Sequence, residues 1–388
     1  MLGDEPGKEF SFPGRRTMLK RVTWGMSNGC DQLTEIWGCQ LIMRPHGRPV
    51  SDDEYPVLKW PDCGLIEHPS EASEKLGPLG EVYVEDGVLR VYENREEYEI
   101  MPKLGAVSHG GWWSVGHCRR VGRNHIAVEL RKLYEGCRPN VVRHFHEYAV
   151  PRAKAKADGR ENGDRNVGVR AQHLLCAYLD MVDTIACLAN ALGLHCNGGD
   201  VGGINRQVLD YEGWWRDIRF APLGHTIPED MPEADFLGRC LEINKLLDHL
   251  RPKPMKTMLE KMGMEKAIFT GWRSFRLLAT LCQLAQIAAE DGDDLLEDGE
   301  ILIARWNEDE KLDCLRPIFA LNQLRQSKAH SIGSGSSHKE DDDPLAVFGI
   351  ERSSTAVGWG RALDNVYERL IEALVASSKL LKRSTARL

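Results

Sequence analysis

The fold of the C-terminal half is decided by an apolar stretch that reads Ala171-Gln-His-Leu-Leu-Cys-Ala-Tyr-Leu-Asp-Met-Val-Asp-Thr-Ile-Ala-Cys-Leu-Ala-Asn-Ala-Leu192. Its apolar side chains recur three and four positions apart, the spacing that places them on one face of an α-helix. They are Leu174, Leu175, Tyr178, Leu179, Val182, Ile185, Ala186, Cys187 and Leu188. Gly193 follows, and glycine commonly ends a helix because it adopts left-handed backbone angles without strain. The stretch therefore predicts a helix with a wide buried face.

Four downstream segments repeat this spacing of apolar residues. Helices are expected over 235–250, about 265–290, 317–330 and about 357–381. The 317–330 helix has Pro317 in its first turn, where proline is favoured because an N–H at that position has no partner within the helix. Together with the first helix, these segments predict a helical bundle over residues 171–388.

Residues 1–150 contain more strand-like sequence than the rest of the chain. Two runs of alternating apolar and polar residues, within Val82 to Tyr92, flank Asp86-Gly87, a pair that favours a tight hairpin turn. The segment from His125 to Leu130 alternates in the same way, and Glu97 to Met101 is a further candidate strand. The sequence thus predicts an α+β protein, with a mixed, strand-containing N-terminal domain over 1–150 and a mainly α-helical domain over 171–388.

A basic segment separates these two predicted domains. Residues 151–170 carry almost no large apolar side chains, and their cations include Arg152, Lys154 and Lys156. Such a composition is typical of a linker or an exposed loop, because it offers little apolar surface for burial. Two interpretations stay open: a solvated loop, or a basic arm that contacts the phosphates of RNA.

The composition is that of a folded chain. Of the 388 residues, 42% are hydrophobic and 28% are charged, which argues against global disorder. The net charge of −8 means that contact with nucleic acid has to come from a local basic patch. No apolar run reaches the roughly 18 residues of a membrane helix, and the acidic N-terminus does not resemble a secretory signal. The 11 cysteines include no Cys-x-x-Cys pair, so we expect reduced thiols in a cytoplasmic protein.

The segment that carries the candidate chemistry reads Pro317-Ile-Phe-Ala-Leu-Asn-Gln-Leu-Arg-Gln-Ser-Lys-Ala-His330. Its Arg325 and His330 lie five positions apart, a spacing that recurs elsewhere in the chain and indicates nothing by itself. Their position is more informative, because they end a predicted helix that the Ser/Gly-rich run 331–337 then breaks. On a regular helix the two side chains lie about 140° apart. His330 therefore has to turn toward the guanidinium where the helix ends.

This arrangement resembles the HEPN family, in which a helical bundle carries a polar residue and an Arg-x4–6-His motif at a helix end, followed by a loop and a closing helix. The likeness covers about residues 171–388. It rests on Leu321-Asn-Gln-Leu-Arg-Gln-Ser-Lys-Ala-His330 and on Gly358-Trp-Gly-Arg-Ala-Leu-Asp-Asn-Val-Tyr-Glu-Arg-Leu370. The segment is similar to HEPN-bearing proteins of bacterial defence islands. The resemblance implies a ribonuclease that acts as a homodimer with a composite site. No tyrosine closely follows His330, which departs from the subgroup regulated by tyrosine AMPylation.

The resemblance assigns catalysis to Arg325 and His330, and these residue types suit RNA cleavage without a metal ion or cofactor. Histidine titrates near neutral pH and exchanges a proton with the 2′-hydroxyl or the 5′-oxygen. Arginine stays charged and stabilises the pentacoordinate phosphorane with paired donors. Asn322 is expected to orient His330 or to hold a phosphate oxygen, and Lys328, with the basic segment, to bind RNA. The expected products are a 2′,3′-cyclic phosphate and a 5′-hydroxyl.

A functional hypothesis follows from the resemblance. The chain is expected to be an effector of bacterial antiphage defence or of a toxin–antitoxin-like stress system that cuts tRNA or other host or phage transcripts. Its N-terminal domain is expected to sense or regulate, and a partner protein to neutralise or activate the nuclease. The alternative is a non-catalytic bundle that binds RNA or dimerises. In that case Arg325 is a surface or capping residue, and His330 is a cation favoured at a helix C-terminus.

Other residues support weaker hypotheses. His117-Cys118 with His144 and His146 offer ligand types that suit zinc, as a metallohydrolase would require, but in no known metal-binding spacing. Strand-like alternation places the last two histidines on one face. The tryptophan pairs at 112–113 and 214–215 favour packing in a core or between domains, with base stacking as the alternative. The glycine-rich run 195–203 lacks the Gly-Lys-Ser/Thr ending of a phosphate loop and predicts only a turn.

Overall fold

The structure, a computed structural model, describes residues 55–77, 79–163, 165–330 and 343–385, together with three strands nearer the N-terminus. The chain divides into two compact units, residues 1–54 and 55–388. In the first unit the three strands form an antiparallel sheet in the order β1-β2-β3. They are β1 (Glu9–Ser11), β2 (Met18–Met26) and β3 (Gly29–Trp37). The predicted domain over 1–150 therefore includes residues of both units.

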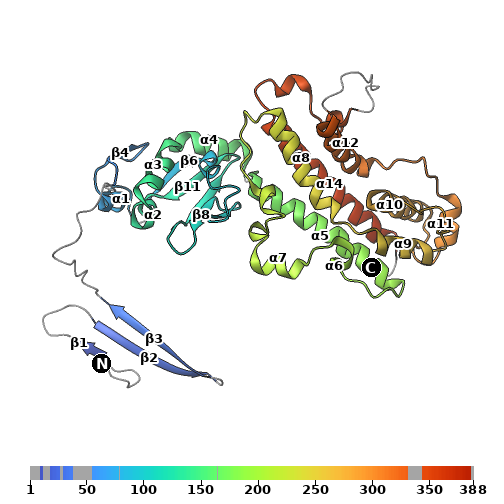
Figure 1. The fold of residues 1–388 in the computed structure, drawn as a ribbon, viewed down its shortest axis with the longest axis horizontal. Helices are drawn as coiled ribbons and strands as arrows, with labels where there is room; N and C mark the ends of the chain where they lie inside the picture. Colours follow the sequence, from blue (N-terminus) through green and yellow to red (C-terminus); the bar gives the residue numbers. More distant parts are fainter. Residues whose placement is uncertain are drawn as a thin grey trace. The chain divides into compact units, whose positions relative to one another are not determined.

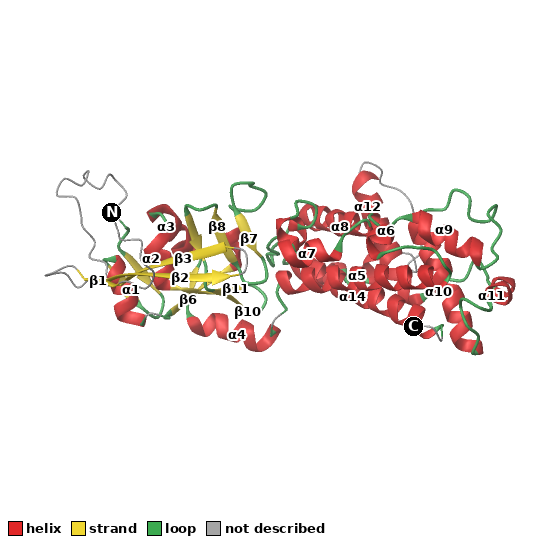
Figure 2. Ribbon diagram, turned by 90° about the horizontal axis from the view of Figure 1, so that it is seen from below, coloured by secondary structure: helices red, strands yellow, loops and turns green. Residues whose placement is uncertain are grey.

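The second unit begins with a strand-rich part built around a four-stranded antiparallel sheet in the order β10-β11-β6-β12 (Figures 1 and 2). Its strands are β6 (Glu81–Glu85), β10 (Cys118–Val121), β11 (His125–Glu129) and β12 (Ala149–Val150). The strand predicted from His125 is confirmed as β11, but all of its residues are buried. Both faces of the sheet are covered: Val84 and Ile126 belong to one core, whereas Tyr83 and Ala127 belong to another.

Short strands and helices complete this strand-rich part. Two further sheets consist of β4 (Leu58–Trp60) with β5 (Gly64–Ile66), and of β7 (Glu99–Met101), β8 (Ala106–His109) and β9 (Trp113–Val115). The helices are α1 (Pro69–Leu76), α2 (Leu130–Gly136), α3 (Pro139–Glu147) and α4 (Arg152–Asn162). The strand expected over 97–101 is thus confirmed as β7. Leu133 of α2 and Phe145 of α3 are fully buried, so these helices close the larger core.

The hairpin predicted over 82–92 is wrong in its second half. The chain leaves β6 and continues as the 3₁₀ helix η1 (Asp86–Leu89). The side chain of Asp86 is buried and accepts a hydrogen bond of 2.5 Å from Nη1 of Arg120. A residue distant in sequence therefore fixes Asp86, and β6 pairs with β11 and β12 instead of with the residues that follow it.

The basic segment 151–170, predicted as a linker or loop, is mostly helical. Its first half forms α4, which packs on β6, β10 and β11. Ala155 is fully buried against the sheet, whereas Lys154 and Lys156 on either side of it are exposed. The helix escapes prediction because its buried face uses alanine, which favours helix but contributes little apolar surface.

The helical part contains the long helices that the sequence predicts (Figure 1). They are α5 (Val167–Ala191), α8 (Glu233–Asp248), α10 (Ser274–Asp291), α12 (Arg316–His330) and α14 (Gly360–Arg383). Only α10 begins clearly later than expected. Shorter elements connect them: α6 (Gly198–Gly202), α7 (Arg206–Glu212), η2 (Trp214–Arg216), η3 (Ala221–Gly224), α9 (Pro252–Lys261), α11 (Gly299–Arg305), η4 (Asp313–Leu315), α13 (Pro344–Val347) and η6 (Arg352–Thr355). The α+β class is therefore confirmed.

Helices α5 and α14 lie side by side at the centre of the helical core (Figure 1). Their contact includes the hydroxyl groups of Thr184 and Ser378, which lie 2.9 Å apart. Among the described residues, one stretch, Arg152–Ala191, contains a window long and apolar enough to cross a membrane. That window is 67% buried inside the protein, which marks α5 as a core helix of this fold.

Buried charges join the strand-rich part to the helical part. Nε of Arg123, in the turn between β10 and β11, donates a hydrogen bond to the carboxylate of Asp364 on α14. Nη1 of the same guanidinium donates to the carbonyl of Ile227 at 3.1 Å. Nη1 of Arg170 on α5 lies 3.4 Å from Oδ1 of Asp364. One carboxylate of the bundle therefore binds arginines from both parts.

The turn that carries Arg123 is held in place by Asp158 of α4. The Asp158 carboxylate accepts the backbone N–H of Arg123 at 3.0 Å and lies 2.6 Å from Nδ1 of His125. Gly122 permits this approach, because its φ is +62° and a Cβ at this position would collide with Asp158. The pair Arg120 and His125, which repeats the spacing of Arg325 and His330, thus serves the packing of the sheet.

Candidate functional site

Helix α12 carries the predicted catalytic residues, and its apolar face fixes its position. Leu321 and Leu324 are buried in the helical core, as the sequence predicts, and α12 packs on α8 and α14. Asn322 is partly exposed and Arg325 is exposed. The polar residues of this helix are therefore accessible to a ligand.

A carboxylate at the end of α8 holds Arg325. Nη1 of Arg325 donates a hydrogen bond of 3.1 Å to Oδ2 of Asp248, and the two side chains are 43% and 46% exposed. The same oxygen accepts a 3.1 Å hydrogen bond from Nδ2 of Asn244, which is fully buried. An exposed ion pair contributes little to stability, so its main effect here is to orient the guanidinium. A phosphate group binds the same guanidinium donors, often through two parallel hydrogen bonds.

His330 is the last residue of α12, where the sequence predicts the end of the helix. The side chains of residues 327–330 and all of residues 331–342 lie outside the described residues. The approach of His330 to Arg325, the role of Lys328 and the helix break at 331–337 therefore stay predictions.

A hollow of about 410 Å³ lies beside Asp248. Its lining residues are Ile218, Arg219, Glu242, Lys245, Asp248 and His249. On the surface, Arg219 pairs with Asp217 at 2.6 Å, and Lys245 pairs with Glu242 at 2.8 Å. Burial, and then the charge of Arg219, lowers the pKa of His249 below the usual histidine range. The hollow thus combines two cations, each paired with a carboxylate, with an imidazole whose lowered pKa favours its neutral form.

Sequence reasoning missed Asp248 as the partner of Arg325, and with it Asn244 and His249, which lie next to Asp248. The helix that contains Asn244 and Asp248 was predicted, but its polar residues form no motif. A signal was nevertheless present, because Asn244 and Asp248 are four positions apart and therefore adjacent on the helix surface. A buried amide has to find hydrogen-bond partners, which points to a polar cluster at this end of α8.

The three basic residues proposed to bind RNA lie on α4 and are not brought to Arg325. Helix α4 packs on the sheet, whereas α12 packs within the helical bundle. Nζ of Lys154 is 2.6 Å from the carboxylate of Glu85, so its charge is partly neutralised. Arg152 and Lys156 are exposed. These three cations therefore belong to the exposed surface of a short helix and not to an extended basic arm.

The histidines considered as metal ligands have structural roles. His144 and His146 lie on helix α3, so the strand predicted for them is wrong. Nε2 of His144 is 2.9 Å from the carbonyl of Val88, and Nε2 of His146 is 3.0 Å from that of Lys59. Among the described residues, no three His, Cys, Asp or Glu side chains are grouped as a metal site requires.

The thiol that was considered with these histidines is also a packing residue. Cys118 is buried in the core of the strand-rich part, and burial raises the pKa of its thiol to about 12. A thiol in this state does not ionise near neutral pH, so it is a poor metal ligand and a poor nucleophile.

The tryptophan pairs mostly pack, as the sequence predicts. Trp113 and Trp214 are buried, and Nε1 of Trp215 donates to Glu99 at 3.2 Å, which links η2 to β7. Trp112 departs from this prediction, because 76% of it is exposed.

The glycine-rich run 195–203 is a capped turn of helix. It contains α6, and the side chain of Asn197 accepts a hydrogen bond from the backbone N–H of Asp200. The Asp200 carboxylate in turn accepts the backbone N–H of Asn197 at 3.0 Å, which completes a capping box. These contacts pair the side chains of Asn197 and Asp200 with the backbone of the run itself.

No protein-family model, no curated protein and no solved structure matches this chain. The site is therefore defined by its own geometry: an exposed arginine near the end of α12, its carboxylate partner on α8, and the adjacent hollow.

Proposed function

We propose that this protein is a metal-independent endoribonuclease of the HEPN type, acting in the cytoplasm as a homodimer. The observation that carries the proposal is the position of Arg325, exposed near the end of a bundle helix whose last residue is His330. The biological role that fits such an activity is an effector of antiphage defence or of a toxin–antitoxin-like system. A partner protein is then expected to restrain or trigger the nuclease.

The proposed reaction is a transesterification, in which a bond from the 2′-oxygen to phosphorus forms and the bond from phosphorus to the 5′-oxygen breaks. The 2′-oxygen attacks phosphorus while His330 accepts its proton, and the 5′-oxygen leaves with a proton supplied by the same imidazole or by its dimer counterpart. Arg325 binds the non-bridging oxygens, where negative charge accumulates in the phosphorane. Asn322, one turn before Arg325 on α12, orients the imidazole of His330 or the phosphate. The products are a 2′,3′-cyclic phosphate and a 5′-hydroxyl.

The test is cleavage of total RNA and tRNA in the presence of EDTA. The wild type and Gln326→Ala, an exposed control on the same helix, should cut RNA, whereas His330→Ala and Arg325→Ala should each lose at least about 100-fold in rate. A 5′-hydroxyl on the product, detected by direct labelling with polynucleotide kinase, should accompany activity. Equal cleavage by wild type and His330→Ala refutes the proposal, as does a wild type that neither cleaves RNA nor inhibits growth.

A second function is favoured by one contact, the ion pair between Arg325 and Asp248. If this pair only fastens α12 to α8, the bundle is a scaffold that dimerises or holds RNA without cutting it. Asp248→Asn separates the two functions. A nuclease loses rate because the guanidinium is no longer oriented, whereas a scaffold changes only in its oligomeric state or RNA affinity, measured by sedimentation and by fluorescence anisotropy.

A further inference from the structure

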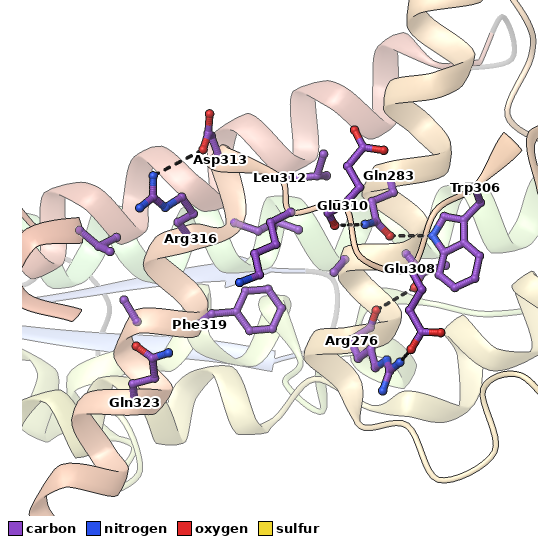
Figure 3. A pocket seen from close by; sticks show the side chains of 16 residues that line it. Arg276, Gln283, Trp306, Glu308, Glu310, Leu312, Asp313, Arg316, Phe319 and Gln323 are labelled. Carbon is purple, nitrogen blue, oxygen red and sulfur yellow. Dashed lines mark hydrogen bonds and ion pairs between the residues drawn. The ribbon is translucent and has the colours of Figure 1, made fainter. Parts of the chain in front are cut away.

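A second cavity, of about 600 Å³, lies on another part of α12 and is independent of the proposed cleavage site. It is lined by residues of α10, of the segment that follows α11, and of the first turns of α12 (Figure 3). Its volume falls within the roughly 300–1,000 Å³ of small-molecule sites. Figure 3 shows Arg276 with Glu308 at one end of the cavity, Arg316 with Asp313 at the other, and Phe319 between them.

One wall of the cavity consists of side chains that satisfy one another. Nε1 of Trp306 donates to Oε1 of Gln283 at 2.7 Å, and Nε2 of Gln283 donates to the carbonyl of Glu310. Arg276 is paired with Glu308, and its guanidinium carbon lies 4.1 Å from the ring centre of Trp272. These polar groups already have partners, so this wall supplies shape to a ligand but few hydrogen bonds.

The opposite wall presents an aromatic ring. Phe319 is 40% exposed, although it lies on a helix whose next residue, Ala320, is buried. Leu312 and Leu315, both buried, also line the cavity. An exposed aromatic ring above an apolar floor is a surface on which a flat ring stacks, a contact that tolerates any nucleobase.

Two cations of this cavity, Lys311 and Arg316, have no tightly bound carboxylate partner among the described residues. Lys311 forms no ion pair with any residue that the structure describes. The guanidinium of Arg316 lies 3.6 Å from Asp313, beyond hydrogen-bonding distance, and the Asp313 side chain is 94% exposed. Figure 3 shows the side chains of Asp313 and Glu310 on the far side of the segment from the Phe319 ring. These two carboxylates therefore do not cover the exposed face of the Phe319 ring.

We propose that this cavity binds a free nucleoside 5′-monophosphate. Its base stacks on Phe319, and its phosphate lies between Lys311 and Arg316. Two cations favour a dianionic phosphate over a single carboxylate, because arginine binds phosphate with paired donors while lysine adds a point charge. Because the Gln283 wall has no spare hydrogen bonds, the site distinguishes little between bases.

Isothermal titration calorimetry on the full chain tests this proposal with AMP, UMP, adenosine and ribose 5-phosphate. AMP and UMP should bind with dissociation constants within about threefold of each other. Adenosine lacks the phosphate and ribose 5-phosphate lacks the base, so each should bind at least about tenfold more weakly, as the loss of one stacking or charge contact implies. Ribose 5-phosphate binding as tightly as AMP overturns the proposal, and so does the absence of AMP binding at millimolar concentration.

Variants then locate the site. Phe319→Ala and Lys311→Gln should each weaken AMP about tenfold, whereas Phe319→Tyr retains a ring and should bind like the wild type. Tyr211→Ala, which removes an aromatic ring that is 92% exposed on α7, is the matched control and should not change binding. Circular dichroism verifies that each variant is folded. Wild-type affinity in both Phe319→Ala and Lys311→Gln shows that the nucleotide binds elsewhere and overturns the assignment. None of these binding measurements requires RNA cleavage, so their outcome does not depend on the nuclease proposal.

Discussion

His225 is a residue whose chemistry is set by its surroundings. It lines a cavity of about 900 Å³ next to α8 and is partly buried. Nη2 of Arg239 donates to the carbonyls of Leu223 and His225, each at 3.1 Å, so a guanidinium is fixed beside the imidazole. Burial, and then the charge of Arg239, lowers the pKa of His225 to about 4. The imidazole is therefore neutral in the folded protein at pH 5, where an exposed histidine is charged.

This neutral histidine should make the protein less stable in mild acid. In the unfolded chain its pKa is about 6.5, so between pH 6.5 and 4 the unfolded state binds a proton that the folded state does not. Its contribution to stability is complete above pH 6.5 and decreases as the pH falls toward 4. Urea unfolding should show that the wild type loses about 1–2 kcal/mol more between pH 7 and pH 5 than His225→Gln does. His195→Gln, at an exposed histidine, should behave as the wild type. Identical losses in wild type and His225→Gln would contradict the expected burial.

At the scale of residues, the sequence predicted the burial or exposure of a side chain better than it predicted the contacts of that side chain. The burial of Leu321 and Leu324 and the exposure of Arg325 follow from helical periodicity, which is a local property. Asp248, the partner of Arg325, is separated from it by 77 positions. Only tertiary packing brings α8 against α12, so no pattern within either segment predicts the pair.

At the scale of elements, periodicity identified those helices that bury large side chains. The long helices of the bundle were predicted because leucine, isoleucine and tyrosine mark their buried faces. Helix α4 was predicted as a loop because its buried residue is the small side chain of Ala155. A charge-rich segment with small apolar residues is compatible with both a helix and a loop. The hairpin at Asp86-Gly87 failed for the opposite reason, since a strong local turn signal was overridden by the distant Arg120.

The helical state of α4 is testable by proline substitution. Lys156 is exposed within the helix, so its side chain can be exchanged without loss of packing. Lys156→Pro removes a backbone hydrogen bond and places the ring against the preceding turn, which should cost about 3 kcal/mol of unfolding free energy. Lys156→Ala should leave the stability nearly unchanged. Urea denaturation measures both, and a Lys156→Pro variant as stable as Lys156→Ala would mean that the segment is a loop.

At the scale of the molecule, the strand-rich part and the helical part were expected to be separate domains. Their contact includes charged side chains that are almost inaccessible to solvent, with Arg123 at 2% and Asp364 at 8% exposure. Buried charges of this kind are costly when unpaired, because desolvation is no longer offset by a counter-ion. The sequence contains both residues, but nothing near either one indicates that they meet across 241 positions.

This contact predicts that a substitution in the strand-rich part also destabilises the helical part. Arg123→Met leaves the Asp364 carboxylate buried without its main partner and should lower the unfolding free energy by about 3–5 kcal/mol. Hydrogen exchange should accelerate in α14 and α5 as well as in β10 and β11, because the parts unfold together when they share a buried ion pair. Arg369→Met, which removes only an exposed pair with Glu372 on α14, should leave exchange unchanged. If Arg123→Met accelerates exchange only in β10 and β11 while α14 keeps its protection, the two parts are independent domains and the buried pair does not couple them.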